Sequence, residues 1–332
     1  MAKRNSSLGK AKEAKNDEFY TQLSDIENEL KHYKKHFKGK TVLCNCDDPR
    51  VSNFFHYFAY KFEDLGLKRL ITTCYKNQER DLFSQNDSER AIWLEYFGDR
   101  NGNRIPDPEE IGIHYFEGNG DFRSAECIEL LKQADIVVTN PPFSLFSEYM
   151  AQLMAYNKYF LVMGSQNALH YKDVFPLIKD NKIWVGYNAP KLFQIPDHAE
   201  GKNIVVVDGV RYQQFGNIIW FTNLDIKKRH EELILYKKFN ADDYPTYENF
   251  DAIDVKEVSE IPVDYFGIMG VPDMFLKIYN PEQFELIGIG SGGLAASIGV
   301  KKNYRGRTDI ALCVNGKHSC PYSRILIRRK EA

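Results

Sequence analysis

The chain has 332 residues, of which 43% are hydrophobic and 14% aromatic, so it can bury a large core and is long enough for two domains. A formal net charge of −2 excludes a protein that binds polyanions through its overall charge. No apolar run approaches the about 20 residues of a membrane span, and the N-terminal stretch lacks the hydrophobic segment of a secretory signal. We therefore expect a cytoplasmic protein with no membrane partner.

The N-terminal region is predicted to form an arm followed by a helix. Residues 1–15 are rich in Lys, Ser, Ala and Asn and predict a flexible arm. Phe19, Tyr20 and Thr21 then precede a charged helix that reaches about His36. An aromatic–Thr pair in this position can place a ring and a hydroxyl beside a cofactor, although a turn at the helix start explains it equally well.

Strands and helices are predicted to alternate over residues 41–221. Apolar residues at helical spacing predict a helix over 50–65, and a polar insertion is expected to contain a short helix at 91–97. A helix is also expected over 124–132. Asp208-Gly209 predicts the turn of an antiparallel hairpin at the edge of the sheet. Extended segments are predicted at 41–46, 70–74, 112–116, 136–139, 159–163, 182–187, 203–207 and 217–221.

This alternation predicts an α/β fold with a parallel sheet that is covered on both faces. Ligands in such folds bind beyond the carboxyl ends of the strands. Four segments follow strands or lie in the predicted loops at that edge, so we expect them to meet there. They are Cys46 to Asp48, Thr73-Cys74, Asp121-Phe122 and Asn140 to Phe143.

The turn Asn140-Pro141-Pro142-Phe143 carries the most specific chemistry. Two successive prolines end the strand at Thr139, because neither has an N–H and each fixes its own φ. Asn140 offers a side-chain carbonyl, Pro141 a backbone carbonyl and Phe143 a flat apolar face. Together they would hold a planar ring with an exocyclic amine, such as adenine, and localise the nitrogen lone pair for attack on a methyl sulfonium. An ordinary strand-ending turn is the alternative.

The C-terminal part is predicted to be a smaller domain. Charged and turn residues prevail over 225–262, and nine basic residues between Lys301 and Lys330 face only Asp309. That excess can neutralise nucleic-acid phosphates, or it is a solvated basic tail.

Two patterns in the same region are weaker. Gly288, Gly290 and Gly293 have dinucleotide-loop spacing, but too few residues follow for a βαβ unit, so we expect a loop. A fourth ligand is missing from the group Cys313, His318 and Cys320, and no metal site is predicted.

Five segments spread over residues 16–330 carry a family likeness. They are Asp17 to Gln22, Leu43 to Pro49 with Ser52 to Phe54, Gly120 to Ser124, Asn140 to Phe143, and Arg324 to Lys330. Together they resemble the EcoRI-type adenine-specific DNA methyltransferases. The Asn-Pro-Pro-Phe turn is shared with amino-methyltransferases in general, whereas Cys-Asn-Cys-Asp-Asp-Pro in place of a glycine-rich loop is more specific.

The resemblance implies a Rossmann-like class I methyltransferase with a mostly parallel seven-stranded sheet. The catalytic domain would span 16–225, and the target-recognition, DNA-binding region 226–332. The implied reaction is transfer of a methyl group from S-adenosylmethionine to N6 of a flipped-out adenine in duplex DNA. Catalysis would fall to Asn140, Pro141, Pro142 and Phe143, and cofactor binding to Phe19, Tyr20, Thr21, Asn45, Cys46, Asp47, Asp48, Thr73, Asp121, Phe122 and Asn140.

The resemblance also implies partners. Double-stranded DNA would be the substrate in a restriction-modification system, with a cognate restriction endonuclease, and a monomer or weak dimer would suit an enzyme that modifies one strand at a time. Two alternatives stay open. One is a methyltransferase for protein glutamine or RNA bases that uses the same turn, and the other is a DNA-binding module without catalysis.

Overall fold

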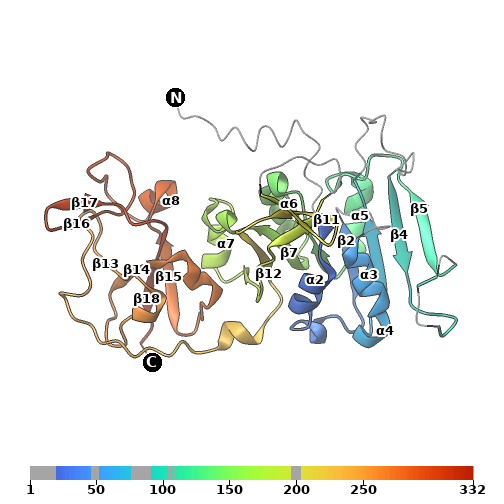
Figure 1. Ribbon diagram of the computed structural model, residues 1–332, viewed down its shortest axis with the longest axis horizontal. Coiled ribbons are helices and arrows are strands. Elements are labelled where there is room, and N and C mark those ends of the chain that lie inside the picture. The colour runs from blue at the N-terminus through green and yellow to red at the C-terminus, as the bar shows by residue number, and fades with distance from the viewer. Residues whose placement is uncertain are drawn as a thin grey trace. The chain divides into compact units, whose positions relative to one another are not determined.

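The computed structural model describes residues 20–45, 52–75, 91–103, 106–107, 109–195 and 203–331 (Figure 1). The chain divides into two compact units. The first contains the described residues up to 168 together with 186–224, and the second contains 169–185 together with 225–331. The assignment of a catalytic domain to residues 16–225 and of a DNA-binding region to residues 226–332 stays a prediction.

The largest sheet has eight strands in the order β5-β4-β3-β2-β6-β7-β12-β8. The pairs β3–β2, β2–β6 and β6–β7 are parallel, whereas β5–β4, β4–β3 and β7–β12 are antiparallel. The sheet is therefore mixed, and the expected seven-stranded, mostly parallel sheet is wrong in both respects. The strands are β2 (Thr41–Asn45), β3 (Arg69–Thr73), β4 (Ile92–Tyr96), β5 (Ile111–Tyr115), β6 (Ile136–Thr139), β7 (Tyr159–Ser165), β8 (Trp184–Val185) and β12 (Ile218–Thr222).

The antiparallel edge explains much of the difference. The segment 91–97 was expected to be a short helix, but it forms β4 between β3 and β5. Its side chains alternate between buried and half-buried positions, with Ile92, Leu94 and Tyr96 on the buried face. Alternation with period two is the pattern of a strand, and β-branched and aromatic residues favour it.

The helices of the first unit lie close to the positions that the spacing of apolar residues predicts. The expected helix over 50–65 is described from residue 53 and is divided at Lys61 into α3 (Asn53–Tyr60) and α4 (Phe62–Leu65). Ser124 caps α5 (Ala125–Gln133), because its hydroxyl accepts the Cys127 N–H at 3.2 Å. The remaining helices are α2 (Leu23–Leu30) and α6 (Phe146–Ala155).

A second sheet in the first unit has the order β1-β9-β11-β10. Its strands are β1 (Tyr20–Thr21), β9 (Leu192–Gln194), β10 (Ile204–Val207) and β11 (Val210–Gln214). The predicted hairpin at Asp208-Gly209 is confirmed, since Val207 pairs with Val210 and both turn residues have positive φ. The hairpin belongs to this smaller sheet and not to the edge of the large one.

The second unit is built on a four-stranded sheet, β13-β14-β18-β15, with a separate hairpin of β16 and β17. Its earlier segment, which contains α7 (Phe175–Lys179), is fixed to the later one. The Lys179 Nζ donates to the Ile287 carbonyl at 2.8 Å, and His170 lies 3.3 Å from Asp273 and 3.0 Å from Ser323. The strands and remaining helix are β13 (Ile253–Asp254), β14 (Ile268–Pro272), β15 (Phe284–Ile289), β16 (Leu312–Val314), β17 (Lys317–Ser319), β18 (Arg324–Arg329) and α8 (Gly292–Ser297).

The glycine motif of the second unit was expected to be a loop, but Gly288 lies in β15 and Gly293 in α8, and the first two glycines of the motif serve packing. A side chain at Gly288 would meet Ile298 at 2.6 Å, and one at Gly290 would meet Ile310 at the same distance. These glycines therefore let apolar side chains close against β15.

Among the described residues, no helix has the length and apolarity that crossing a membrane requires.

Candidate active site

The strand order places a switch point between β2 and β6. The chain passes from β2 to β3 on one side and later returns to β6 on the other side. In open α/β sheets ligands bind at such a point, outside the carboxyl ends of the strands. Asn45 ends β2 and Thr139 ends β6, so the predicted turn that begins at Asn140 starts directly at this crevice.

Hydrogen bonds join the two strand ends. The Thr139 hydroxyl donates to the backbone carbonyl of Asn45, and the Tyr149 hydroxyl donates to the Asn45 side-chain oxygen. All three residues are buried, with Asn45 6% exposed and the other two 0%. Because Tyr149 belongs to α6, this group fixes one side of the switch point to the helix that follows the turn.

Tyr149 also positions the predicted Phe122. The two rings meet edge to face, with centroids 5.0 Å apart and planes at 74°. The Gln152 side chain donates to the Phe122 carbonyl at 3.0 Å, so α6 holds both the ring and the backbone of this residue. Tyr149 therefore contacts Phe122 through its ring and Asn45 through its hydroxyl.

Gly120 brings this loop against the end of β3. Its φ is +73°, and a Cβ there would lie 2.1 Å from the Cys74 carbonyl oxygen. Only glycine permits this backbone conformation together with so close an approach. In the sheet Thr73 pairs with Asn45, so Asp121 and Phe122 lie near both strand ends, as predicted.

Asp121 is engaged by its neighbour Arg123. The Arg123 backbone N–H and Nε both donate to Oδ1 at 2.9 Å, and a terminal nitrogen donates to Oδ2 at 2.7 Å. These hydrogen bonds lower the pKa of the Asp121 carboxyl from its usual 3.8. A second terminal nitrogen of Arg123 reaches Glu148 of α6 at 3.0 Å.

This ion pair predicts a pH-dependent effect of Arg123→Gln. The Asp121 pKa is lower in the folded than in the unfolded protein, so the stabilisation is present above pH 3.8 and is lost as the pH falls through the folded value. The pair is partly exposed, so we expect a loss of about 1 kcal/mol or less at pH 7. Urea unfolding of both proteins at several pH values measures it. A difference that persists unchanged at pH 2–3 would contradict this role.

Thr21 of β1 also lies near the carboxyl ends of the strands of the large sheet. The Asn53 side chain, at the start of α3, donates to the Thr21 carbonyl at 2.7 Å. The Thr21 hydroxyl donates to the sulfur of Met163, near the end of β7, at 3.5 Å. Thr21 is only 1% exposed, so its hydroxyl fixes β1 to the sheet.

The Asn-Pro-Pro-Phe turn is partly buried. Asn140 is 8% exposed and its side-chain oxygen is shielded from solvent, while Pro141 is also buried. Phe143 begins a short 3₁₀ helix (Phe143–Leu145) and is half-buried. Its ring meets Phe215 edge to face at 6.1 Å. The predicted catalytic residues thus occupy consecutive positions at the switch point.

Four predicted cofactor residues, Phe19, Cys46, Asp47 and Asp48, lie outside the described residues. Tyr20 is in β1 beside Thr21. Two residues that organise the site, Gly120 and Tyr149, had no predicted role. The Asn-Gly-Asp string around Gly120 was a usable signal for a positive φ, whereas nothing in the sequence distinguishes Tyr149 from other apolar residues of its helix.

Replacing Tyr149 by Phe tests the central hydrogen bond. The change leaves the buried Asn45 side-chain oxygen without its hydroxyl donor, and we expect a loss of about 1–3 kcal/mol in the free energy of unfolding. Urea unfolding measures it, with Tyr159→Phe as the control because Tyr159 is 54% exposed. Equal stabilities of the two variants would contradict the role given to Tyr149.

An Asn-Pro-Pro-Phe turn that follows a strand at the switch point of an α/β sheet suits a methyltransferase that acts on amino groups. The sequence matches the family described as adenine-specific methyltransferase EcoRI over residues 7–330, and the chain belongs to that family. The expected class, an adenine-specific DNA methyltransferase of the restriction-modification type, is thereby confirmed.

Three relatives cover almost the whole chain. The Type II methyltransferase M.EcoRI of Escherichia coli is 47% identical over 98% of this chain and 97% of its own length. M.MpnI of Mycoplasma pneumoniae is 39% identical, over 98% of both chains. M.MgeORF184P of Mycoplasma genitalium is 38% identical, over 98% of this chain and 99% of its own. No solved structure matches the chain.

Proposed function

We propose that the protein binds S-adenosylmethionine beyond the carboxyl ends of β2, β3 and β6 and methylates N6 of an adenine that is flipped out of duplex DNA. The observation that carries this proposal is the position of the Asn140 to Phe143 turn. It follows β6 directly at the switch point, where Thr139 is hydrogen-bonded to Asn45.

The residues at this edge fit the proposed cofactor. Asn45, Thr73 and Asn140 are polar side chains that are 3–8% exposed at the carboxyl ends of the strands. Buried polar groups in such a crevice suit a ligand with amino, carboxylate and hydroxyl groups. When bound, S-adenosylmethionine supplies an electrophilic methyl sulfonium.

Asp121 has capacity for one more hydrogen bond. Each carboxylate oxygen has two lone pairs, and Arg123 uses both on Oδ1 but only one on Oδ2. The remaining Oδ2 position can accept an N–H of the cofactor, with Phe122 beside it. The Arg123 hydrogen bonds keep Asp121 ionised, which suits an acceptor.

The turn would hold the target base. The side-chain carbonyl of Asn140 and the backbone carbonyl of Pro141 would each accept one N–H of the adenine amine, and Phe143 would stack on the ring. Extruding a base from the duplex costs a few kcal/mol, which this stacking and these hydrogen bonds would offset. Holding both amine hydrogens directs the nitrogen lone pair at the methyl group and needs no strong general base.

The second unit would contact DNA. Lys301, Lys302, Arg305, Arg307 and Lys317 are exposed and can neutralise phosphates. Arg324 is less suited, because its Nε is 2.8 Å from the buried Asp254 carboxylate. The predicted restriction endonuclease partner and the predicted monomer or weak dimer remain part of this proposal.

The test offers the purified protein S-adenosylmethionine with a tritiated methyl group, together with duplex DNA, RNA or protein. We expect label in duplex DNA alone, as N6-methyladenine. Sequencing the methylated adenines in DNA from cells that express the protein then gives the recognition site. Label in RNA or in protein glutamine would favour the alternative substrates. Failure of the protein to bind S-adenosylmethionine, with DNA binding retained, would favour a DNA-binding module without catalysis.

A further inference from the structure

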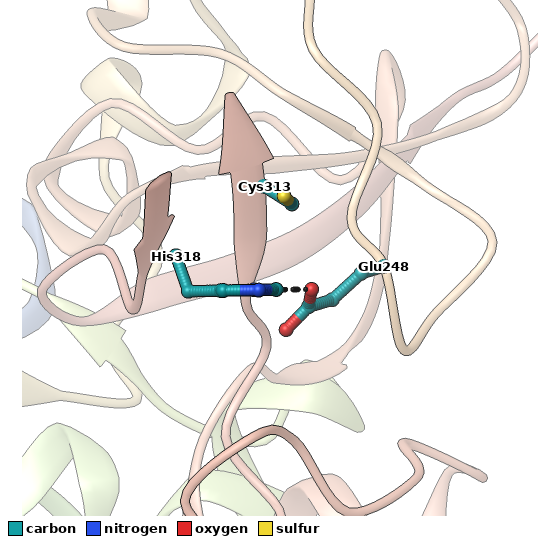
Figure 2. A group of neighbouring side chains, drawn as sticks. All are labelled: Glu248, Cys313 and His318. Atoms are coloured by element: carbon teal, nitrogen blue, oxygen red, sulfur yellow. Dashed lines mark hydrogen bonds and ion pairs between the residues drawn. The ribbon is translucent and has the colours of Figure 1, made fainter. Parts of the chain in front are cut away.

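Three side chains that can bind a metal meet in the second unit, and none of them belongs to the proposed active site. Glu248, Cys313 and His318 each bring one potential ligand atom to within 4.8 Å of the other two. Figure 2 shows the His318 ring directed at the Glu248 carboxylate, 2.8 Å from Nδ1 to the nearer oxygen. We propose that these residues form a Zn²⁺ site, which goes beyond the proposed methyl transfer.

The β16–β17 hairpin places two of the ligands. Cys313 pairs directly with His318 across the hairpin, and this is the second pair counted from the two-residue turn Asn315-Gly316. In such a hairpin the first pair from the turn is hydrogen-bonded, so the Cys313–His318 pair is not. Non-hydrogen-bonded pairs have the closest side chains, with Cα atoms about 4.5 Å apart. Both side chains therefore leave the same face of the hairpin together.

Glu248 is brought to this face by the backbone. Its N–H donates to the Ala311 carbonyl at 2.8 Å, and Tyr247 forms an antiparallel bridge with Leu312. Tyr247 is itself buried, and its hydroxyl donates to Asp254 at 2.6 Å. The carboxylate is thus held beside the hairpin although it is 70 residues from His318 in the sequence.

The donor set selects the metal. A thiolate, an imidazole and a carboxylate suit Zn²⁺, whereas Mg²⁺ and Ca²⁺ require oxygen ligands. Water would complete a tetrahedral site. Binding would release the proton of the Cys313 thiol, and the neutral His318 ring would bind through Nδ1 with its proton on Nε2. Cys320, which the sequence grouped with these residues, is directed elsewhere, because its sulfur accepts the Asn303 amide at 3.4 Å.

The experiment uses the full chain, stripped of metal with a chelator and titrated with Co²⁺ as a spectroscopic substitute for Zn²⁺. We expect one equivalent to produce a thiolate-to-cobalt charge-transfer absorption that Zn²⁺ abolishes. Cys313→Ser should remove the absorption, and His318→Gln or Glu248→Gln should weaken Co²⁺ binding at least about tenfold. Cys320→Ser is the matched control and should leave the spectrum unchanged.

A second measurement does not depend on variants. Cys313 of the unmodified chain should react with iodoacetamide, and one equivalent of Zn²⁺ should slow this reaction at least about tenfold, as peptide mapping reveals. Absence of the charge-transfer absorption, its loss in Cys320→Ser, or alkylation of Cys313 at the same rate with and without Zn²⁺ would each overturn the site. None of these readouts requires methyl transfer, so the site and the proposed function fail separately.

Discussion

Replacing Asn140 by alanine is expected to lower the rate of methyl transfer at least about a hundredfold. The variant lacks one of the two acceptors that hold the adenine amine, and removal of one positioned hydrogen-bonding group at a reacting centre typically costs about 10²–10³ in rate. Cofactor affinity should change much less, because Asn45 and Asp121 remain. Single-turnover transfer of a tritiated methyl group to duplex DNA measures the rate, and calorimetry measures cofactor binding.

Asn28→Ala is the control for this experiment. Asn28 is exposed on α2, where its side chain only accepts a hydrogen bond from Lys31, so the same chemical change should leave the rate intact. Turnover of Asn140→Ala within threefold of the Asn28→Ala rate would remove the catalytic role from Asn140. A parallel loss of cofactor binding and rate would instead assign Asn140 to the cofactor.

Replacing Gly120 by alanine is expected to cost about 2–4 kcal/mol in the free energy of unfolding and to weaken cofactor binding. The positive φ alone costs about 1–2 kcal/mol for a residue with a Cβ. The new Cβ would also lie 2.1 Å from the Cys74 carbonyl oxygen, so the loop must move away from the end of β3. Asp121 and Phe122 would move with it.

Gly209→Ala separates the two causes. Gly209 has a φ of +79°, but a Cβ there would have no neighbour within 4 Å. This control should show the conformational cost alone, with no change in cofactor affinity. If both variants lose the same stability and both bind the cofactor normally, the close approach of Gly120 to β3 has no functional part. Urea unfolding and calorimetry provide the two measurements.

The strands at the switch point were predictable from sequence because they are buried on both faces. The runs at 41–44 and 136–139 are apolar or β-branched and are each followed by an Asn, which is the pattern of a central strand that ends in a turn. The strand at 92–96 was missed because a short apolar segment within a polar insertion suits either a helix or a strand. Only its pairing with β3 and β5 decides between them.

The contacts that organise the candidate site could not be predicted from the sequence. Tyr149 reaches Asn45 across 104 positions of the chain, and Thr139 does so across 94. A single sequence carries no record of which distant side chains meet, so only the residues of local motifs were predictable. The Asn-Pro-Pro-Phe turn is such a motif, because its geometry comes from adjacent prolines.

The second unit is assembled from two pieces of the chain, since residues 169–185 join 225–331. Exchanging the C-terminal part between relatives by a single crossover near residue 225 would therefore produce a chimera in which the two pieces of the second unit come from different parents. In such a chimera Lys179 and His170 would come from one parent, whereas their partners Ile287, Asp273 and Ser323 would come from the other. A graft that carries both pieces keeps these contacts within one parental sequence.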